Sequence, residues 1–379
     1  MIALRKMLVV ANTDWFLWNF LSAFLALHLR RGIAVTAVSP AGRYIEDLRR
    51  LGLTWLEFPM ARGRGSAGNA LASARSLARA LRDCQPDLVM LITAKPVLLG
   101  KWAIQRDQKL ISVLPGLGRA LAGSGTRSVL DRWAIRQGVR WATARTNSRV
   151  VFHQASDRDR VLGTSTAVLA KTSLIPGWGV DLGRFSGPRA PQTPPLVVLI
   201  SRMLSTKGIA EFVEAAETCR RSIEAKFVLV GEPDVGNPDA VASSQLEAWE
   251  ARGSVEWWGH RQDIPEILSR ASICVLPSKY GEGVPQSLIE AAAAGVPIVA
   301  SDIPGCREVV THDGNGLLVP PGDAQALAEA VLALLRSPER SDEMGQVGRT
   351  MARERYSTAV ILDAYRRLYE TLGLQLPDE

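Results

Sequence analysis

Short runs of apolar residues alternate with longer amphipathic segments along the whole chain. In the first half, the apolar runs predict strands at residues 7–11, 33–39, 53–58, 88–92, 110–113 and 149–152. Helix-length segments lie between most of them, for example at residues 69–83 and 126–144. A strand, a helix and a second strand in succession are typical of βαβ units, so the pattern predicts a parallel sheet.

The same pattern restarts after a proline-dense stretch at residues 187–195, which we interpret as an interdomain linker. Further strands are predicted at residues 196–200, 226–230, 255–257, 273–276 and 298–301. The fold class is therefore α/β, with two Rossmann-like parallel-sheet domains at 1–187 and 188–357 and a cleft between them. Residues 358–379 form a third segment that begins with a helix.

Composition narrows the class of protein. A chain of 379 residues is long enough for two α/β domains, and its 47% hydrophobic and 22% charged residues are ordinary for a globular protein. The four cysteines have no paired or metal-ligand spacing, which favours reduced thiols in the cytoplasm. No apolar run reaches the roughly 18 residues of a membrane span. The net charge of +7 favours anionic partners without choosing among them.

Two carboxylates mark the most informative segment. Glu282 lies in a glycine-rich loop after the predicted strand 273–276, and Glu290 lies on the helix predicted at 286–294. Because ligands of open α/β sheets bind beyond the carboxyl ends of strands, both side chains are expected to face one pocket. The backbone N–H groups of Gly283 and Val284 would hold a phosphate there, which leaves Glu290 for neutral hydroxyls such as those of a ribose.

Two cations follow the first strand of the second domain. Arg202 comes directly after residues 196–200, and Lys207 comes five residues later at the start of a helix. A guanidinium binds two phosphate oxygens at once and an ammonium acts as a point charge, so the pair suits a diphosphate.

The Glu282–Glu290 segment resembles the E-x7-E element of the family 4 glycosyltransferases, which have the GT-B fold. Arg202 and Lys207 resemble the Arg-x4-Lys element of that family, although Ser201 stands where the family usually has glycine. The resemblance assigns catalysis to Arg202, Lys207 and Glu282. It assigns donor binding to Gly231, Glu232, Arg261, Gly283, Val284, Pro285 and Glu290, with Arg261 nearest the base. It also implies that the C-terminal helix crosses back to the first domain.

The resemblance implies a retaining transfer from a UDP-sugar, with no cofactor and no required metal. Arg202, Lys207 and the loop amides would stabilise the departing UDP, and Glu282 would position the donor sugar. The leaving phosphate oxygen can accept the acceptor's proton, so a protein base is not required.

The first domain is expected to bind the acceptor. Candidate residues follow its predicted strands, namely Asn12, Asp14, Trp15, Lys95, Gly116 and Gly118. Together with residues 304–307 and 177–181, these segments resemble enzymes that add N-acetylhexosamines to polyprenyl-diphosphate-linked sugars of O-antigens or N-glycan precursors. Many family members have a histidine in the loop that here contains residues 115–118, and the first loop lacks the usual glycine pair. We hypothesise an N-acetylated or 6-deoxy donor sugar.

Two further segments leave alternatives open. The aromatic cluster at Trp15 and Trp18, with Arg30 and Arg31 behind it, is either a surface for peripheral contact with the inner face of the membrane or a helix packed on the sheet. Asp157 and Asp159 have the spacing of a metal-binding pair, but their position at a predicted helix start suits helix capping better.

Three other functions fit the sequence less well. A nucleotide-sugar epimerase would need acid and base residues, and the chain has only four histidines. A catalytically silent scaffold of a polysaccharide assembly complex has no physical need for Arg202, Lys207, Glu282 and Glu290. A nucleic-acid-binding module would need basic residues interleaved with aromatics along one surface, a pattern visible only in the first helix.

Overall fold

The computed structural model describes residues 1–60, 67–117, 126–163, 166–234 and 236–378. The chain divides into two compact units, and the C-terminal segment belongs to the first of them. Unit 1 contains residues 1–179 and 358–379, and unit 2 contains residues 180–357. The C-terminal helix α17 (Thr358–Glu370) thus begins where the chain returns to unit 1, which is the position expected from the sequence.

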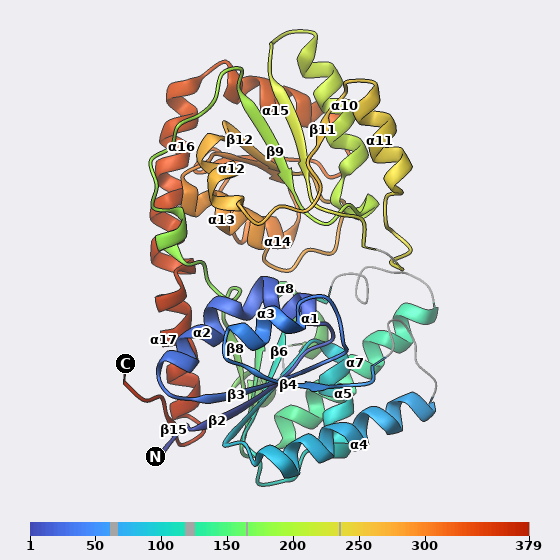
Figure 1. The fold of residues 1–379 in the computed structure, drawn as a ribbon, viewed down its shortest axis with the longest axis vertical. Coiled ribbons are helices and arrows are strands. Elements are labelled where there is room, and N and C mark those ends of the chain that lie inside the picture. The colour runs from blue at the N-terminus through green and yellow to red at the C-terminus, as the bar shows by residue number, and fades with distance from the viewer. Residues whose placement is uncertain (61–66, 118–125, 164–165, 235, 379) are drawn as a thin grey trace. The chain divides into compact units, whose positions relative to one another are not determined.

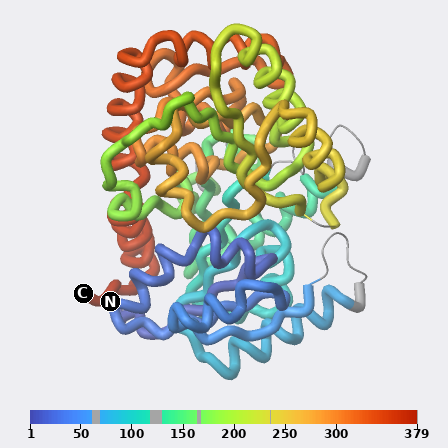
Figure 2. Tube along the Cα trace, turned by 45° about the horizontal axis from the view of Figure 1, so that its top comes forward, coloured from blue at the N-terminus to red at the C-terminus, as the bar shows by residue number. Residues whose placement is uncertain are grey.

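Unit 1 is built around a seven-stranded sheet in the order β4-β3-β2-β5-β6-β7-β8, with every neighbouring pair parallel (Figure 1). Its strands are β2 (Lys6–Val10), β3 (Ala34–Ser39), β4 (Thr54–Glu57), β5 (Leu88–Ile92), β6 (Leu110–Leu114), β7 (Ser148–Phe152) and β8 (Thr172–Leu174). The short strands β1 (Ile2–Ala3) and β15 (Leu374–Gln375) pair with each other, so the two ends of the chain lie side by side (Figure 2).

Helices cover both faces of this sheet because its strands are apolar on both sides. One face packs on α1 (Asp14–Phe16), the π-helical η1 (Leu17–Leu21), α2 (Ser22–Arg30), α3 (Ile45–Arg50) and α17. The other face packs on α4 (Ala67–Cys84), α5 (Ala94–Ala103), α7 (Thr126–Ala144) and α8 (Ala155–Leu162), and the short α9 (Thr166–Leu169) precedes β8. Along β2, Met7 and Val9 enter the first core while Leu8 and Val10 enter the second.

Unit 2 has a six-stranded parallel sheet in the order β11-β10-β9-β12-β13-β14. Its strands are β9 (Leu196–Ile200), β10 (Lys226–Val230), β11 (Glu256–Trp257), β12 (Ile273–Leu276), β13 (Ile298–Ser301) and β14 (Gly316–Val319). The helices are η2 (Leu182–Phe185), η3 (Ser205–Lys207), α10 (Ile209–Arg220), α11 (Ser243–Ala251), α12 (Ile264–Arg270), α13 (Gln286–Ala294), α14 (Pro304–Arg307), α15 (Ala324–Leu335), α16 (Pro338–Met351) and the π-helical η4 (Ala352–Tyr356).

The boundary between the units differs from the sequence expectation by eight residues. The segment 180–187 belongs to unit 2, where Phe185 packs in a core with α12 and α13. The proline-dense stretch also lies inside unit 2, so it does not connect the two units, although most of its residues are exposed. Its Ala190 and Gln192 N–H groups donate to the carbonyls of Ser269 and Arg270 at the end of α12.

Candidate functional site

The order of strands in unit 2 places β9 and β12 at a topological switch point. From β9 the chain proceeds to β10 and β11 on one side, and then crosses to β12, β13 and β14 on the other side. Loops that leave the carboxyl ends of two such strands run in opposite directions and leave a crevice where ligands of open α/β sheets bind. Arg202 and Lys207 follow β9, and Glu282 follows β12, so the loops that carry the predicted residues leave the sheet on either side of this point.

A salt bridge joins the two loops across the switch point. The Nζ of Lys207 lies 2.5 Å from Oε1 of Glu282, and 18% of the lysine side chain and 8% of the glutamate side chain are exposed. Gly208 makes this approach possible, since a Cβ at that position would lie 2.0 Å from the carbonyl oxygen of Pro277, the residue after β12, and its φ is +74°. The ammonium and the carboxylate are therefore held together by backbone that only glycine allows.

Glu282 is held by more than the lysine. The hydroxyl of Ser278 donates to the same Oε1. Gly305 in α14 lies against the loop, because a Cβ there would come within 1.9 Å of the carbonyl oxygen of Gly283. The buried thiol of Cys306 lies nearby, where burial and then the negative charge of Glu282 raise its pKa. The loop that contains Glu282 is thus packed between the segments after β9 and β13.

Arg202 also has an acidic partner. Its Nη1 lies 2.7 Å from Oδ2 of Asp234, in the loop after β10, and 40% of the arginine side chain is exposed. The sequence analysis did not single out Asp234 or Ser278. The signal for both was their position after a predicted strand of the same sheet, at the edge that holds Arg202 and Glu282.

Gly231 fixes the geometry of the adjacent loops. Its φ is +139°, and a Cβ would lie 1.8 Å from the carbonyl oxygen of Ser201. Its N–H donates to the carbonyl of Gly259 over 2.7 Å, and its carbonyl accepts from the indole of Trp257 over 2.8 Å. The carbonyl of the next residue, Glu232, accepts from the N–H of Met203. The loops after β9, β10 and β11 are therefore one hydrogen-bonded layer.

Glu290 lies in the second turn of α13. Its Oε1 is 3.4 Å from the side-chain nitrogen of Gln286, one turn earlier. Burial raises the pKa of Glu290 to about 7, and the hydrogen bond from Gln286 and the charge of Arg184 act in the opposite direction. A carboxyl group near its pKa at neutral pH can both donate to and accept from a hydroxyl, which is compatible with the predicted contact with a ribose. Pro285 is the N-cap residue of this helix.

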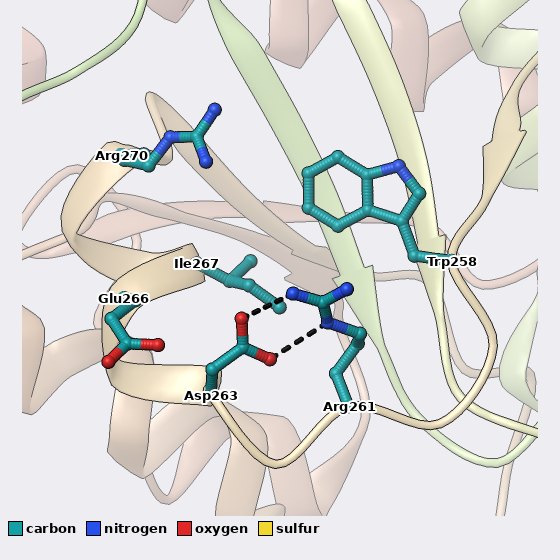
Figure 3. Close-up of a pocket in the computed structure, with 6 residues that line it drawn as sticks. All are labelled: Trp258, Arg261, Asp263, Glu266, Ile267 and Arg270. Atoms are coloured by element: carbon teal, nitrogen blue, oxygen red, sulfur yellow. Dashed lines mark hydrogen bonds and ion pairs between the residues drawn. The ribbon is translucent and has the colours of Figure 1, made fainter.

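Arg261 lies at a separate hollow of about 310 Å³ between the β11–α12 loop and α12 (Figure 3). Its guanidinium faces Asp263 in a bidentate ion pair, with Nε 2.8 Å from Oδ1, and lies 5.9 Å from the centre of the Trp258 ring. Glu266, Ile267 and Arg270 complete the lining. The guanidinium of Arg261 is thus paired with Asp263. The predicted contact between Arg261 and a nucleotide base stays a prediction.

Comparison with known proteins identifies this unit. Residues 185–351 match the family model described as "Glycosyl transferases group 1", a range that covers nearly all of unit 2. Unit 2 is a glycosyltransferase group 1 domain. The resemblance drawn from the motifs is thereby confirmed.

The similarity extends over most of the chain. It is 28% identical over 355 residues to N,N'-diacetylbacillosaminyl-diphospho-undecaprenol alpha-1,3-N-acetylgalactosaminyltransferase of Campylobacter jejuni, covering 89% of this chain and 90% of that protein. It is 35% identical to alpha-maltose-1-phosphate synthase of Mycolicibacterium smegmatis, over 53% of this chain and 51% of that protein.

Solved structures confirm the fold. HepE of Anabaena, in complex with UDP and glucose, superposes with a TM-score of 0.77 at 21% identity and covers 97% of this chain and 99% of its own. Sucrose-phosphate synthase of Thermosynechococcus elongatus superposes with the same TM-score of 0.77 at 18% identity, with 97% and 99% covered. The chain therefore has the GT-B fold of two Rossmann-like units.

Unit 1 has its own switch point between β2 and β5. Asn12 follows β2, while Thr93 and Lys95 follow β5. The side-chain oxygens of Asn12 and Thr93 are buried and have no hydrogen-bond partner among the described residues. Burial lowers the pKa of Lys95. Buried polar atoms are normally paired, so these two oxygens at one sheet edge are candidates for contact with a polar ligand, and the acceptor role of Asn12 and Lys95 stays a prediction.

Thr93 is also strained. Its φ is +75°, a region that a β-branched residue rarely adopts and that costs about 1–3 kcal/mol. Backbone strain of this kind gathers at functional sites. Thr93 was not among the candidates predicted from the sequence, because a dihedral angle leaves no mark in the sequence.

The aromatic helix start of unit 1 is packed inside the unit. Asp14 is buried and accepts the N–H of Tyr44 over 2.8 Å, so it holds the loop after β3. The ring of Trp15 lies edge-on to Phe20 at 5.2 Å, and the ring of Trp18 stacks on Tyr44 at 6.3 Å. Both tryptophans are half-buried. These contacts favour the packed helix over the membrane surface as the interpretation of this segment.

The loop after β6 contains the last two acceptor candidates. Gly116 is described, and its neighbour Leu117 donates its N–H to Asp157 over 2.8 Å. Gly118 lies outside the described residues. Asp157 is buried in the first turn of α8, and Asp159 pairs with Arg158. The expected helix capping is wrong, because the N-cap residue of α8 is Gln154, whose side chain makes no capping hydrogen bond. No helix in the described ranges is long and apolar enough to span a membrane.

Proposed function

We propose that the protein is a retaining glycosyltransferase that moves a sugar from a UDP-sugar to a lipid-linked saccharide during synthesis of a surface polysaccharide. The observation that carries this proposal is the group formed by Arg202, Lys207 and Glu282 at the switch point of unit 2. The name of the C. jejuni relative, which describes transfer onto a diphospho-undecaprenol-linked sugar, supports the acceptor class. The UDP and glucose in the HepE complex support the donor class.

The donor sugar that we favour is an N-acetylated hexosamine or a 6-deoxyhexosamine. The C. jejuni relative is named as an N-acetylgalactosaminyltransferase, which supports the first of these. The acceptor would be a polyprenyl-diphosphate-linked saccharide. We expect the enzyme to work in the cytoplasm, in peripheral contact with the inner face of the membrane, where such an acceptor lies.

The chemistry follows from where charge develops. When the bond between the anomeric carbon and the phosphate oxygen breaks, its electron pair leaves with UDP and negative charge grows on the β-phosphate. Arg202 and Lys207 would stabilise that charge by exchanging part of their contacts with Asp234 and Glu282 for phosphate oxygens. The two cations supply the charge for which other transferases use a metal ion, so the proposal requires none.

Glu282 would act on the sugar. As Lys207 turns to the phosphate, the carboxylate is left facing the electron-poor anomeric carbon and the sugar hydroxyls, which it orients. The acceptor oxygen attacks the same face from which UDP departs, and its proton passes to the departing phosphate oxygen. This sequence of events gives retention and needs no protein base.

The first experiment is calorimetric binding of UDP, GDP and ADP to the wild type and to Arg202→Ala. We expect selective binding of UDP, and a Kd at least tenfold higher in the variant because charge-assisted hydrogen bonds to phosphate are lost. Arg221→Ala, an exposed arginine just after α10, is the matched control and should bind UDP like the wild type. Folded wild-type protein that binds no nucleotide would contradict the proposal, and a preference for GDP would replace the donor class.

A further inference from the structure

Two tryptophans stand out because they are exposed. Of the ten tryptophans in the chain, only Trp102 at the end of α5 and Trp133 in α7 expose most of their surface, 66% and 62%. Leu130 and Val129 precede Trp133 by three and four residues and are also exposed, at 56% and 53%. Residues at that spacing share one face of a helix, so α7 presents an apolar face that nothing in the described structure covers.

Helices α5 and α7 form one layer on the same side of the unit 1 sheet, next to α4 (Figure 1). Gly138 of α7 lies against Leu98 of α5, where a Cβ would come within 3.1 Å of the leucine side chain. Gly100 of α5 lies in the same way against the Trp141 ring of α7, at 3.3 Å. Leu98 and Trp102 are one helical turn apart. The two exposed tryptophans are thus fixed on adjoining helices.

The positive charge of the protein is concentrated on these helices. Together α4, α5 and α7 contain nine arginines and lysines and two aspartates, an excess of seven that equals the net charge of the whole chain. Lys95 belongs to the predicted acceptor edge of the sheet, whereas the exposed cations in the described part of these helices are Arg75, Arg79, Arg82, Lys101, Arg136 and Arg140. Elsewhere acidic and basic residues balance at 36 each, since the chain has 45 basic and 38 acidic residues in total. Arg136 and Arg140 follow Trp133 along α7 and are exposed, and Lys101 adjoins Trp102.

We propose that the exposed face of α4, α5 and α7 docks on an anionic lipid bilayer. Tryptophan rings partition to the boundary between headgroups and acyl chains, and arginines bind lipid phosphates, so this combination of side chains matches such a surface. A second copy of the chain is a poorer occupant, because two faces with this excess of positive charge repel each other. The proposal rests on the lipid-linked acceptor of the proposed function, since docking would bring unit 1 to that substrate.

The test is flotation with two kinds of vesicle, one of phosphatidylcholine alone and one that also contains phosphatidylglycerol. A phosphatidylglycerol fraction of about 30% makes the vesicle surface anionic. We expect the wild type to bind only the anionic vesicles and to be released by salt. We expect two double variants each to have a partition coefficient at least tenfold lower than that of the wild type. One combines Trp102→Ser with Trp133→Ser, and the other combines Arg136→Glu with Arg140→Glu. The matched controls lie in unit 2: Val347→Ser, 51% exposed, and Arg221→Glu with Arg252→Glu, both exposed.

The outcomes separate docking from the proposed function. UDP affinity, measured on the same variants, should not change, because the nucleotide residues lie in unit 2, and circular dichroism should show intact folding. If both variants bound the anionic vesicles as strongly as the wild type does, the proposal would be overturned. It would also be overturned if the wild type did not bind anionic vesicles. A wild-type dimer that the tryptophan variant dissociates would assign the face to a second copy. Vesicle binding without sugar transfer to any lipid-linked acceptor would refute the proposed function and leave docking intact.

Discussion

At the scale of single residues, the candidate site consists of charges held in opposed pairs. Lys207 pairs with Glu282 and Arg202 pairs with Asp234, so each cation has an anionic partner already in place. Such ion pairs hold the long side chains of Arg202 and Lys207 in one position before a ligand binds. A diphosphate carries more negative charge than one carboxylate, so it can replace the carboxylates as the partner of both cations. Glu290 differs because burial raises its pKa by more than the hydrogen bond from Gln286 and the charge of Arg184 lower it.

The raised pKa of Glu290 predicts how stability depends on pH. The carboxyl group has a pKa of about 7 in the folded state and 4.5 ordinarily, so folding favours its neutral form. Its contribution to stability is complete below about pH 4.5 and is lost as the pH rises through 7. At pH 5 we expect Glu290→Gln to have about the same free energy of unfolding in urea as the wild type. At pH 8 the free energy of unfolding of the variant should be higher, by on the order of 2 kcal/mol.

The control for this prediction is Gln286→Ala at the same pH values. That variant removes the hydrogen bond which lowers the pKa of Glu290, so the loss of stability with rising pH should become steeper. An equal difference between Glu290→Gln and the wild type at pH 5 and pH 8 would contradict the assignment.

At the scale of elements, α17 is attached to unit 1 by a buried aromatic cluster. His28 of α2 makes two hydrogen bonds, from Nδ1 to the carbonyl of Phe24 over 2.8 Å and between Nε2 and the hydroxyl of Tyr369 over 3.0 Å. Because a carbonyl only accepts, Nδ1 must hold the proton, and Nε2 therefore accepts from Tyr369. Tyr365 stacks on Trp178 at 5.8 Å, but its buried hydroxyl has no partner among the described residues.

The two tyrosines of α17 should respond differently to loss of the hydroxyl. Tyr369→Phe leaves Nε2 of His28 buried without a donor and should lower the free energy of unfolding by about 1–2 kcal/mol. Tyr365→Phe removes an unpaired polar group from the same helix and should be neutral or slightly stabilising. Chemical denaturation of both variants measures the difference, and equal destabilisation would show that the bond to His28 does not hold α17 in place.

At the scale of the whole molecule, buried titratable groups of opposite kind occupy the two units. Burial lowers the pKa of His28 to about 4 and that of His153 to about 3, and both belong to unit 1. Glu290, with its raised pKa, belongs to unit 2. A histidine whose folded pKa is lowered contributes stability above about pH 6.5 that is lost as the pH falls toward 4.

Acidification should therefore act on the units in opposite directions. Between pH 7 and pH 5 we expect peptides of unit 1, such as residues 24–28 and 365–369, to lose protection from hydrogen exchange after correction for the intrinsic rate. Peptides from α13 should keep or gain protection over the same interval. Mass spectrometry of exchange resolves the two sets, and a parallel loss in both units would contradict the prediction.

The sequence by itself determined most strands of unit 2 and the family to which that unit belongs. Apolar runs predicted β5, β9, β10, β12 and β13 at their observed ends, because a strand buried on both faces must be apolar throughout. Strand β14 was not predicted, since it opens with Gly316 after a polar loop and gains its stability from pairing with β13. The local pattern of apolar residues does not show which distant strand a segment pairs with.

Only the tertiary structure decided which side chains meet and which stay exposed. The pairing of Arg202 with Asp234, the orphaned oxygens of Asn12 and Thr93, and the burial of Asp14 depend on the order of strands in each sheet. Trp15 and Trp102 have the same side chain, yet one packs against Phe20 and the other faces outward from α5. The exposed fraction of a side chain depends on the residues that pack around it, and the fold determines which residues those are.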